Sequence, residues 1–140
     1  MAVAIIWPTI ALVALVYCVW FVLFRQRIAH IKRSPPTAED FADSEAALRY
    51  FRPVEMPANN LANLFEMPVL YFALVPLLLH FDLANPIQVA LAWAFVAARG
   101  AHSWIHIARG PIPLRFAVYI ASCALLAAMW IGFTVDLLNT

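Results

Sequence analysis

The chain has 140 residues, of which 65% are hydrophobic and 12% charged, whereas soluble domains average roughly 45–50% apolar and 25% charged residues. This composition, with only 3 glycines, indicates an integral membrane protein built from long helices and argues against a membrane β-barrel, which needs many short segments and turns. The net charge of +1 gives no reason to expect a nucleic-acid partner.

The first apolar segment covers residues 4–24. Its basic residues follow the apolar run and no small-residue cleavage site ends it, so we expect a retained transmembrane helix rather than a cleaved signal peptide. A charged connection follows, beginning "RQRIAHIKRSPP" and reaching Pro57. Within it, "AALRYF" is compatible with a short amphipathic helix at the membrane surface and equally with a solvated loop.

Three further apolar segments cover residues 61–81, 87–107 and 114–135. Each is close to the ~20 residues that cross a ~30 Å hydrocarbon core. The connections "DLANP" and "ARGPIP" are short, so consecutive helices should be antiparallel neighbours. The sequence therefore predicts one all-α domain, an integral membrane four-helix bundle. Cys18 and Cys123 lie inside apolar runs and are interpreted as small core residues rather than a disulfide.

The distribution of basic residues predicts the orientation. Lysines and arginines are concentrated between the first two spans and around the third connection, while "DLANP" and both termini have none. Because cytoplasmic loops carry the excess of positive charge, both termini should be non-cytoplasmic.

Each of the last three predicted helices carries one polar stripe at helical spacing. The stripes consist of Asn59, Asn63 and Glu66, then Arg99, His102 and His106, then Arg115, Tyr119 and Ser122. All three fall in the cytoplasmic half of their spans, so these side chains can meet. Ionisable residues at membrane depth cost about 2.5–3.5 kcal/mol each, so Glu66 and Arg99 should face protein or water and find partners.

Three interpretations of the stripes remain open. The polar groups could satisfy one another and simply lock the helices together. They could line a cavity for a ligand that carries both charges. His102 and His106, spaced i, i+4, could also join Glu66 as metal ligands, although no fourth ligand is evident.

The stretches "NLFEMPVLYFAL" and "RGAHSWIHIARGPIPLRFAVY" resemble the MAPEG family, the membrane-associated proteins in eicosanoid and glutathione metabolism. The resemblance rests on three spacings: Asn63 to Glu66, Arg99 to His102, and Arg115 to Tyr119. It covers all four predicted spans in order and length, and it is closest to bacterial members, which implies a bacterial inner membrane.

The resemblance implies a homotrimer in the membrane lipid, with glutathione as cofactor between subunits at the cytoplasmic side. Asn63 and Glu66 would hold the γ-glutamyl end, and Arg115 would be the catalytic residue that stabilises the thiolate. The remaining binding positions would be Arg99, His102, His106 and Tyr119. This chain departs from the pattern in Asn59 and Ala62, where glutathione-using members carry arginines, and in His106, where many have tyrosine.

The resulting functional hypothesis is a membrane glutathione transferase or peroxidase. The alternative is a non-catalytic structural or accessory subunit of a larger membrane complex.

Overall fold

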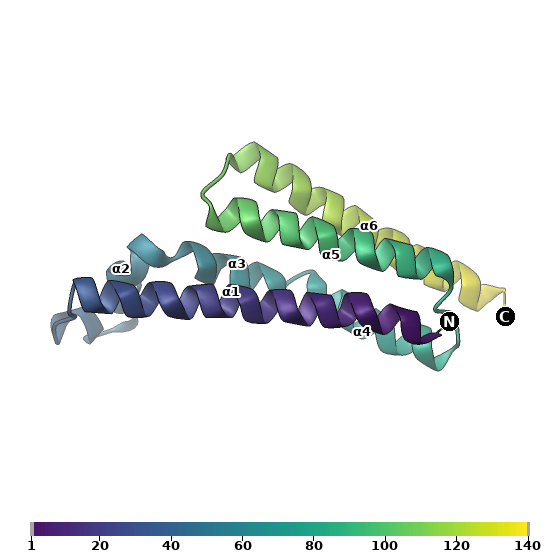
Figure 1. The fold of residues 1–140 in the computed structure, drawn as a ribbon, viewed down its shortest axis with the longest axis horizontal. Helices are drawn as coiled ribbons and strands as arrows, with labels where there is room; N and C mark the ends of the chain where they lie inside the picture. The colour runs from purple at the N-terminus through teal and green to yellow at the C-terminus, as the bar shows by residue number, and fades with distance from the viewer. Residues whose placement is uncertain (1, 140) are drawn as a thin grey trace.

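The computed structural model describes residues 2–139, which are helical and contain no strand (Figure 1). The α-helices are α1 (Ile6–Arg33), α2 (Ser44–Phe51), α3 (Met56–Leu64), α4 (Pro68–His80), α5 (Pro86–Ile107) and α6 (Ile112–Leu138). Short 3₁₀ helices are η1 (Ala2–Ile5), η2 (Glu39–Phe41) and η3 (Arg52–Val54). The all-α prediction is confirmed.

Three helical segments in the described residues are long and apolar enough to cross a membrane: Val3–Arg33, Met56–His80 and Ile112–Leu138. The α5 helix has sufficient length, with 22 residues, but it is not among them, because its polar residues lower its hydropathy. The fourth span, predicted at residues 87–107, therefore stays a prediction.

The long connection after α1 contains the helix α2, which settles the choice left open between a helix and a loop. Asp43 caps it: the backbone is extended and the carboxylate accepts a hydrogen bond from the Ala46 N–H at 2.8 Å. Just before it, the Thr37 N–H and hydroxyl both donate to the Asp40 carboxylate. These two bonds lower the pKa of Asp40 below its usual value.

The second apolar segment is interrupted, whereas the sequence analysis treated residues 61–81 as one continuous helix. The helix begins earlier, at Met56, and breaks at residues 65–67 before α4 starts. Pro68 explains the break, since proline has no N–H to donate and its ring collides with the carbonyl four residues earlier. Glu66 therefore lies in the break rather than on a helical face shared with Asn63.

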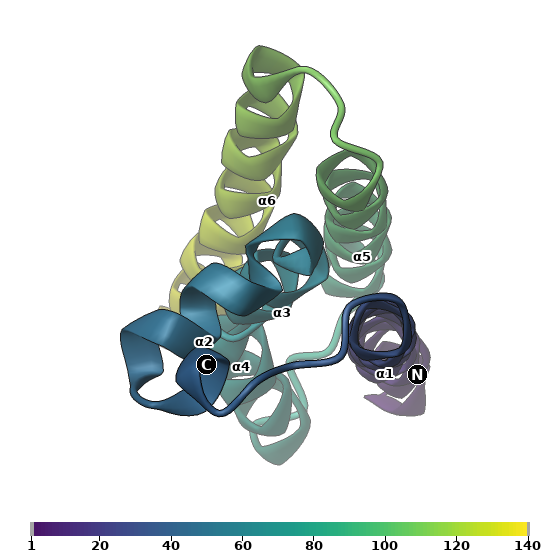
Figure 2. The same ribbon diagram turned by 90° about the vertical axis from the view of Figure 1, so that its left-hand side faces the viewer.

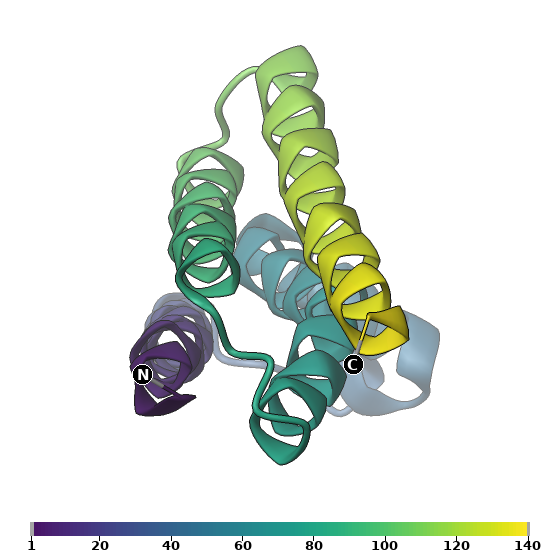
Figure 3. The same ribbon diagram turned by 90° about the vertical axis from the view of Figure 1, so that its right-hand side faces the viewer.

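The α5 helix packs against several of the other helices. It packs antiparallel to α6 and also contacts α1 and α3, as the end-on views show (Figures 2 and 3). The ends of the described chain lie together at one end of the molecule, whereas α2 and the α5–α6 turn lie toward the other (Figure 1).

An apolar core joins α1, α4, α5 and α6 near the termini. Tyr71 stacks on Phe95 with ring centroids 5.3 Å apart, and its hydroxyl meets that of Thr9 at 3.0 Å. The buried Gln88 donates to the Met129 carbonyl across α5 and α6 at 2.9 Å. These bonds satisfy polar groups in the half of the bundle that lacks the predicted site.

Two helices end with a non-glycine residue in the left-handed region. Asp82 follows α4 with φ 56° and Arg109 follows α5 with φ 55°. In each case the N–H of the next residue bonds back to the helix, Leu83 to Leu78 at 2.9 Å and Gly110 to Ile105 at 2.8 Å. This geometry closes the helix end but normally favours glycine at the left-handed position.

Candidate functional site

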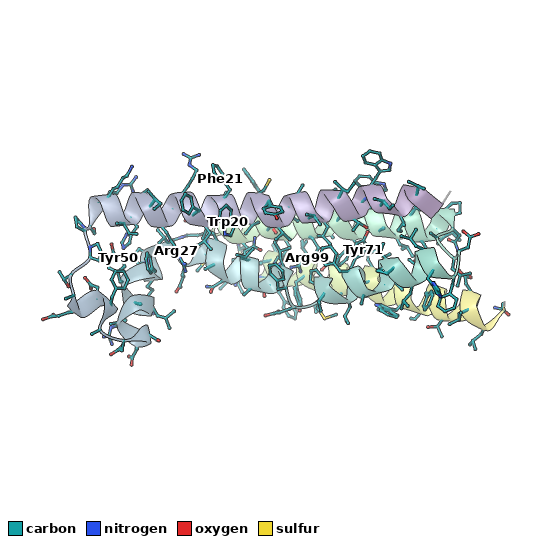
Figure 4. All side chains as sticks on the ribbon, turned by 90° about the horizontal axis from the view of Figure 1, so that it is seen from below. Trp20, Phe21, Arg27, Tyr50, Tyr71 and Arg99 are labelled. Carbon is teal, nitrogen blue, oxygen red and sulfur yellow. The ribbon has the colours of Figure 1, made fainter. Side chains whose placement is uncertain are left out.

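Arg99 is the centre of the polar cluster. It is fully buried, on the inner face of α5, and Figure 4 shows it between the helices. Its Nη2 donates to the Asn63 carbonyl of α3 at 2.9 Å, and its guanidinium carbon lies 5.7 Å from the Tyr119 ring centroid. Its Nε and Nη1 have no hydrogen-bond partner among residues 2–139. Arg99 thus joins α3, α5 and α6 while two of its donor nitrogens stay unpaired.

The break after α3 explains why a backbone carbonyl is available to Arg99. The last carbonyls of any helix lack donors from within the helix, and Asn63 is in the last turn of α3. At membrane depth no water satisfies such a group, so another part of the protein must. The break after α3 therefore leaves a carbonyl without a helical donor, and the buried Arg99 supplies that donor.

Two histidines extend the cluster along α5. His102 and His106 are both buried, with ring centroids 5.6 Å apart. His102 Nδ1 lies 3.1 Å from the Arg115 carbonyl. Because a carbonyl only accepts, Nδ1 must carry the proton, which leaves Nε2 as an acceptor when the ring is neutral. Nε2 has no hydrogen-bond partner in the described part of the chain.

A pocket of about 220 Å³ opens beside this cluster. Its lining combines α3, α5 and α6: Asn63, His102, Ile112, Arg115, Phe116 and Tyr119. Four of these six residues are predicted site residues from three different helices. The structure therefore brings Asn63, His102, Arg115 and Tyr119 around one space, with Arg99 behind Tyr119 and His106 beside His102.

Glu66 is placed differently. It is exposed in the single chain and makes no ion pair with Arg99 within the described residues, although it interacts electrostatically with Arg99 and Tyr119. Asn59 is also exposed, while its neighbour Asn60 is fully buried. The observed partner of Arg99 is therefore a backbone carbonyl rather than the Glu66 carboxylate.

The metal interpretation depends on three ligands that lie together. Among residues 2–139 no group of three histidine, cysteine, aspartate or glutamate side chains could hold a metal ion. His102 and His106 are adjacent, but Glu66 does not join them.

Sequence reasoning missed two groups at the cluster. Cys123 lies close to Arg99 and Tyr119, and Ser103 is buried with a hydroxyl that has no partner in residues 2–139. Cys123 follows Tyr119 by four residues, so helical spacing could have revealed it. Ser103 follows Arg99 by four residues and precedes His106 by three, so the same spacing could have revealed it too.

Comparison with known proteins agrees with the motifs of α3, α5 and α6. The model of the MAPEG family matches residues 5–135, nearly the whole chain. No curated protein and no solved structure matches it. The resemblance predicted from the sequence is confirmed.

Proposed function

The chain belongs to the MAPEG family, and we propose that it binds glutathione in the pocket between α3, α5 and α6. Membership makes it a membrane protein of the family active in glutathione and eicosanoid metabolism. The observation that carries the proposal is the pocket lining, in which Asn63, His102, Arg115 and Tyr119 converge from three helices. Polar donors around a partly apolar space are the usual composition of a small-molecule site.

The chemistry proposed for this pocket is activation of the glutathione thiol. A free thiol has a pKa of about 8.5, and a neighbouring cation lowers it, which increases the fraction of the nucleophilic thiolate. Arg115 supplies such a cation at the pocket wall. Asn63, Tyr119 and His102 offer acceptors and donors for the peptide part. Glu66 does not line the pocket of the single chain, and its carboxylate would reach the ligand's amino group only from a neighbouring copy in the oligomer proposed below.

Two reactions are compatible with an activated thiolate. In transfer, the sulfur forms a bond to an electrophilic carbon, and the leaving group departs with its electron pair. In peroxide reduction, two glutathione molecules become one disulfide, and the peroxide becomes an alcohol and water. Both use the same thiolate, so the pocket supports either one.

We also propose that the chain is a homotrimer with four spans and both termini non-cytoplasmic. Glu66 supports an oligomer, because it is exposed near the middle of the apolar segment Met56–His80 and a lipid-facing carboxylate costs about 2.5–3.5 kcal/mol. A second copy would cover it and complete the open pocket. The contacts of α5 with α1, α3 and α6 support the fourth span, since its polar residues are sheltered by neighbours.

A structural or accessory role is the second candidate, and one observation favours it. Arg99 and His102 already have backbone partners on other helices, at 2.9 and 3.1 Å, as a helix lock would require. The unpaired Nε and Nη1 of Arg99 and Nε2 of His102 argue for a site that accepts a ligand.

The test is thiolate absorbance of the purified protein on addition of glutathione, with the particle mass measured in parallel. We expect a trimer that generates thiolate, and we expect Arg115→Lys to abolish the absorbance without dissociating the trimer, because lysine lacks the planar fork of donors. His102 bonds the Arg115 backbone rather than its side chain, so this change preserves that contact. The matched control is Arg33→Lys, at the exposed end of α1. If the wild-type protein binds no glutathione at millimolar concentration, the catalytic proposal fails.

A further inference from the structure

A second hollow, of about 660 Å³, lies beside the proposed glutathione pocket at the same end of the molecule. It is formed where the segment connecting α2 to α3 meets the turn between α5 and α6. Its lining includes Arg49, Arg52, Arg109 and Arg115. We call it the arginine cleft. Of these four, Arg115 was predicted to be a site residue, whereas Arg49, Arg52 and Arg109 contributed only to the predicted orientation.

The cleft has a strong excess of positive charge. Glu55 is the one carboxylate among its lining residues, so four guanidinium groups face a single negative charge. Arg49 forms an ion pair with Glu45 at 3.0 Å, but both side chains are mostly exposed, at 66% and 80%. Such a pair is weak and can be exchanged for a better anion. Arg52 has no side-chain partner in the described residues.

Arg109 is held in place at a conformational cost. Its left-handed backbone is one that arginine adopts unfavourably and glycine adopts freely. Its Nη2 donates to the Pro53 carbonyl at 2.8 Å, which ties the α5–α6 turn to η3. Gly110 cannot carry a side chain here, because a Cβ would lie 2.7 Å from the Ile105 side chain. The α5–α6 turn therefore holds the Arg109 guanidinium in the wall of the arginine cleft.

The predicted orientation of the protein in the membrane does not by itself explain why four arginines line one cleft. The positive-inside rule requires basic residues near the cytoplasmic ends of the spans, but not their convergence on one hollow. Lys32 and Arg33 satisfy that rule at the exposed end of α1 without lining the cleft. The residues that do converge are all arginines, whose planar fork matches the oxygens of phosphate.

We propose that the arginine cleft binds a phosphate group at the membrane surface. A phosphate monoester carries close to two negative charges and three acceptor oxygens at neutral pH, which suits several guanidinium groups better than a single carboxylate does. The cleft is roomier than a phosphate requires, so it would admit an attached headgroup or ester. Basic pockets between membrane helices commonly hold anionic lipid headgroups, and a soluble phosphate ester would offer the same chemistry.

The proposal is independent of glutathione binding. Arg49, Arg52 and Arg109 do not line the glutathione pocket, and only Arg115 and Ile112 border both spaces. Loss of phosphate binding with intact thiolate formation, or the reverse, would separate the two.

The experiment uses the full chain purified in detergent and has two arms. Native mass spectrometry measures binding of phosphatidic acid against phosphatidylcholine, and calorimetric titration measures binding of pyrophosphate. The variants are Arg52→Gln and Arg49→Gln, and the matched control is Arg33→Gln, which removes the same charge from the same predicted cytoplasmic connection. Size-exclusion profiles check folding, and both positions are exposed, so neither substitution removes a buried side chain.

We expect Arg52→Gln and Arg49→Gln to weaken binding by at least about tenfold each, as loss of a charged hydrogen bond predicts, and Arg33→Gln to change it less than about twofold because exposed charges are screened. This pattern with phosphatidic acid supports a lipid ligand, and the same pattern with pyrophosphate supports a soluble one. Absence of binding in both arms overturns the proposal. Equal weakening by Arg33→Gln also overturns it, since the attraction would then be general rather than local.

Discussion

The buried Arg99 provides the sharpest test of whether the polar cluster is a helix lock or a ligand site. The informative change is Arg99→Met, which keeps a long flexible side chain and its packing but removes the charge. Arg99→Lys is the matched control, because it keeps the charge without the planar fork.

Arg99→Met should change the free energy of unfolding through opposing contributions of similar size. Arg99→Met loses one charged hydrogen bond to Asn63, worth about 1.5–3 kcal/mol, and a contact with the Tyr119 ring, worth about 2 kcal/mol in a desolvated setting. It also removes the several kcal/mol that a buried guanidinium loses in desolvation. Because Arg99 is fully buried with two unpaired nitrogens, we expect the last term to offset the others. The net change in the free energy of unfolding should be within about 2 kcal/mol.

Arg99→Lys should be less stable than Arg99→Met. It retains the desolvation penalty, but the shorter ammonium must reach the Asn63 carbonyl from a different geometry. A lock that depends on positive charge predicts the opposite order, with lysine tolerated and methionine damaging.

The assay is thermal unfolding in one detergent, with and without glutathione. Ligand at a hundred times its dissociation constant adds about 2.7 kcal/mol to the stability of a protein that binds it. Wild-type protein should show this increase and Arg99→Met should not. If Arg99→Met destabilises the protein by more than about 4 kcal/mol while lysine is accepted, the arginine is a lock and the ligand argument from its unpaired nitrogens is refuted.

Other predictions concern local structure and topology. Asp82→Gly should raise the free energy of unfolding by about 0.5–1 kcal/mol in thermal melts, because the left-handed residue after α4 favours glycine; a loss would show that the Asp82 side chain has an unseen role. Asp43→Ala should cost α2 about 1 kcal/mol by removing its cap, seen as faster amide exchange at Ala46, and unchanged exchange would contradict the cap. The pKa of Asp40 is lowered in the folded protein by its bonds to Thr37, so its contribution to loop order should hold above the ordinary aspartate pKa of 3.8 and be lost as pH falls through the lowered value. Proteolysis of the loop measures this, and Asp40→Asn should abolish the pH dependence. A cysteine at position 82 should react with an impermeant reagent from outside sealed cells and one at Ala38 should not, and labelling at Ala38 would reverse the orientation.

The sequence predicted the positions of helices well where an apolar segment belongs to one uninterrupted helix, and less well elsewhere. The predicted segment at residues 4–24 begins in η1 and continues in α1, and the segment at residues 114–135 lies within α6. The α1 helix extends past the predicted segment to Arg33, because a helix needs no apolar residues to extend beyond the membrane. The break at residues 65–67 was missed, since an apolar run conceals it. Proline alone does not reveal it either, because Pro76 lies inside α4 without ending the helix.

At the candidate site the sequence predicted which residues share a face of a helix, but not which atoms they contact. Helical spacing places Arg99, His102 and His106 on one side of α5, and all three are buried. It does not show that Arg99 and His102 bond to backbone carbonyls, since every residue offers a carbonyl and the pattern of side chains cannot select one. The arginine cleft was hidden for a related reason, because its arginines come from segments far apart in the chain.

The break in the second segment connects these observations. Pro68 ends α3, the end of α3 leaves carbonyls without helical donors, and Arg99 donates to one of them at 2.9 Å. The same break turns Glu66 out of a helical face and leaves it exposed. The carbonyl that receives the Arg99 hydrogen bond and the exposed Glu66 carboxylate thus both belong to the same interruption of the helix. If the homotrimer forms as proposed, the carboxylate of one copy faces its neighbour, and the open pocket beside Arg99 becomes a site between subunits.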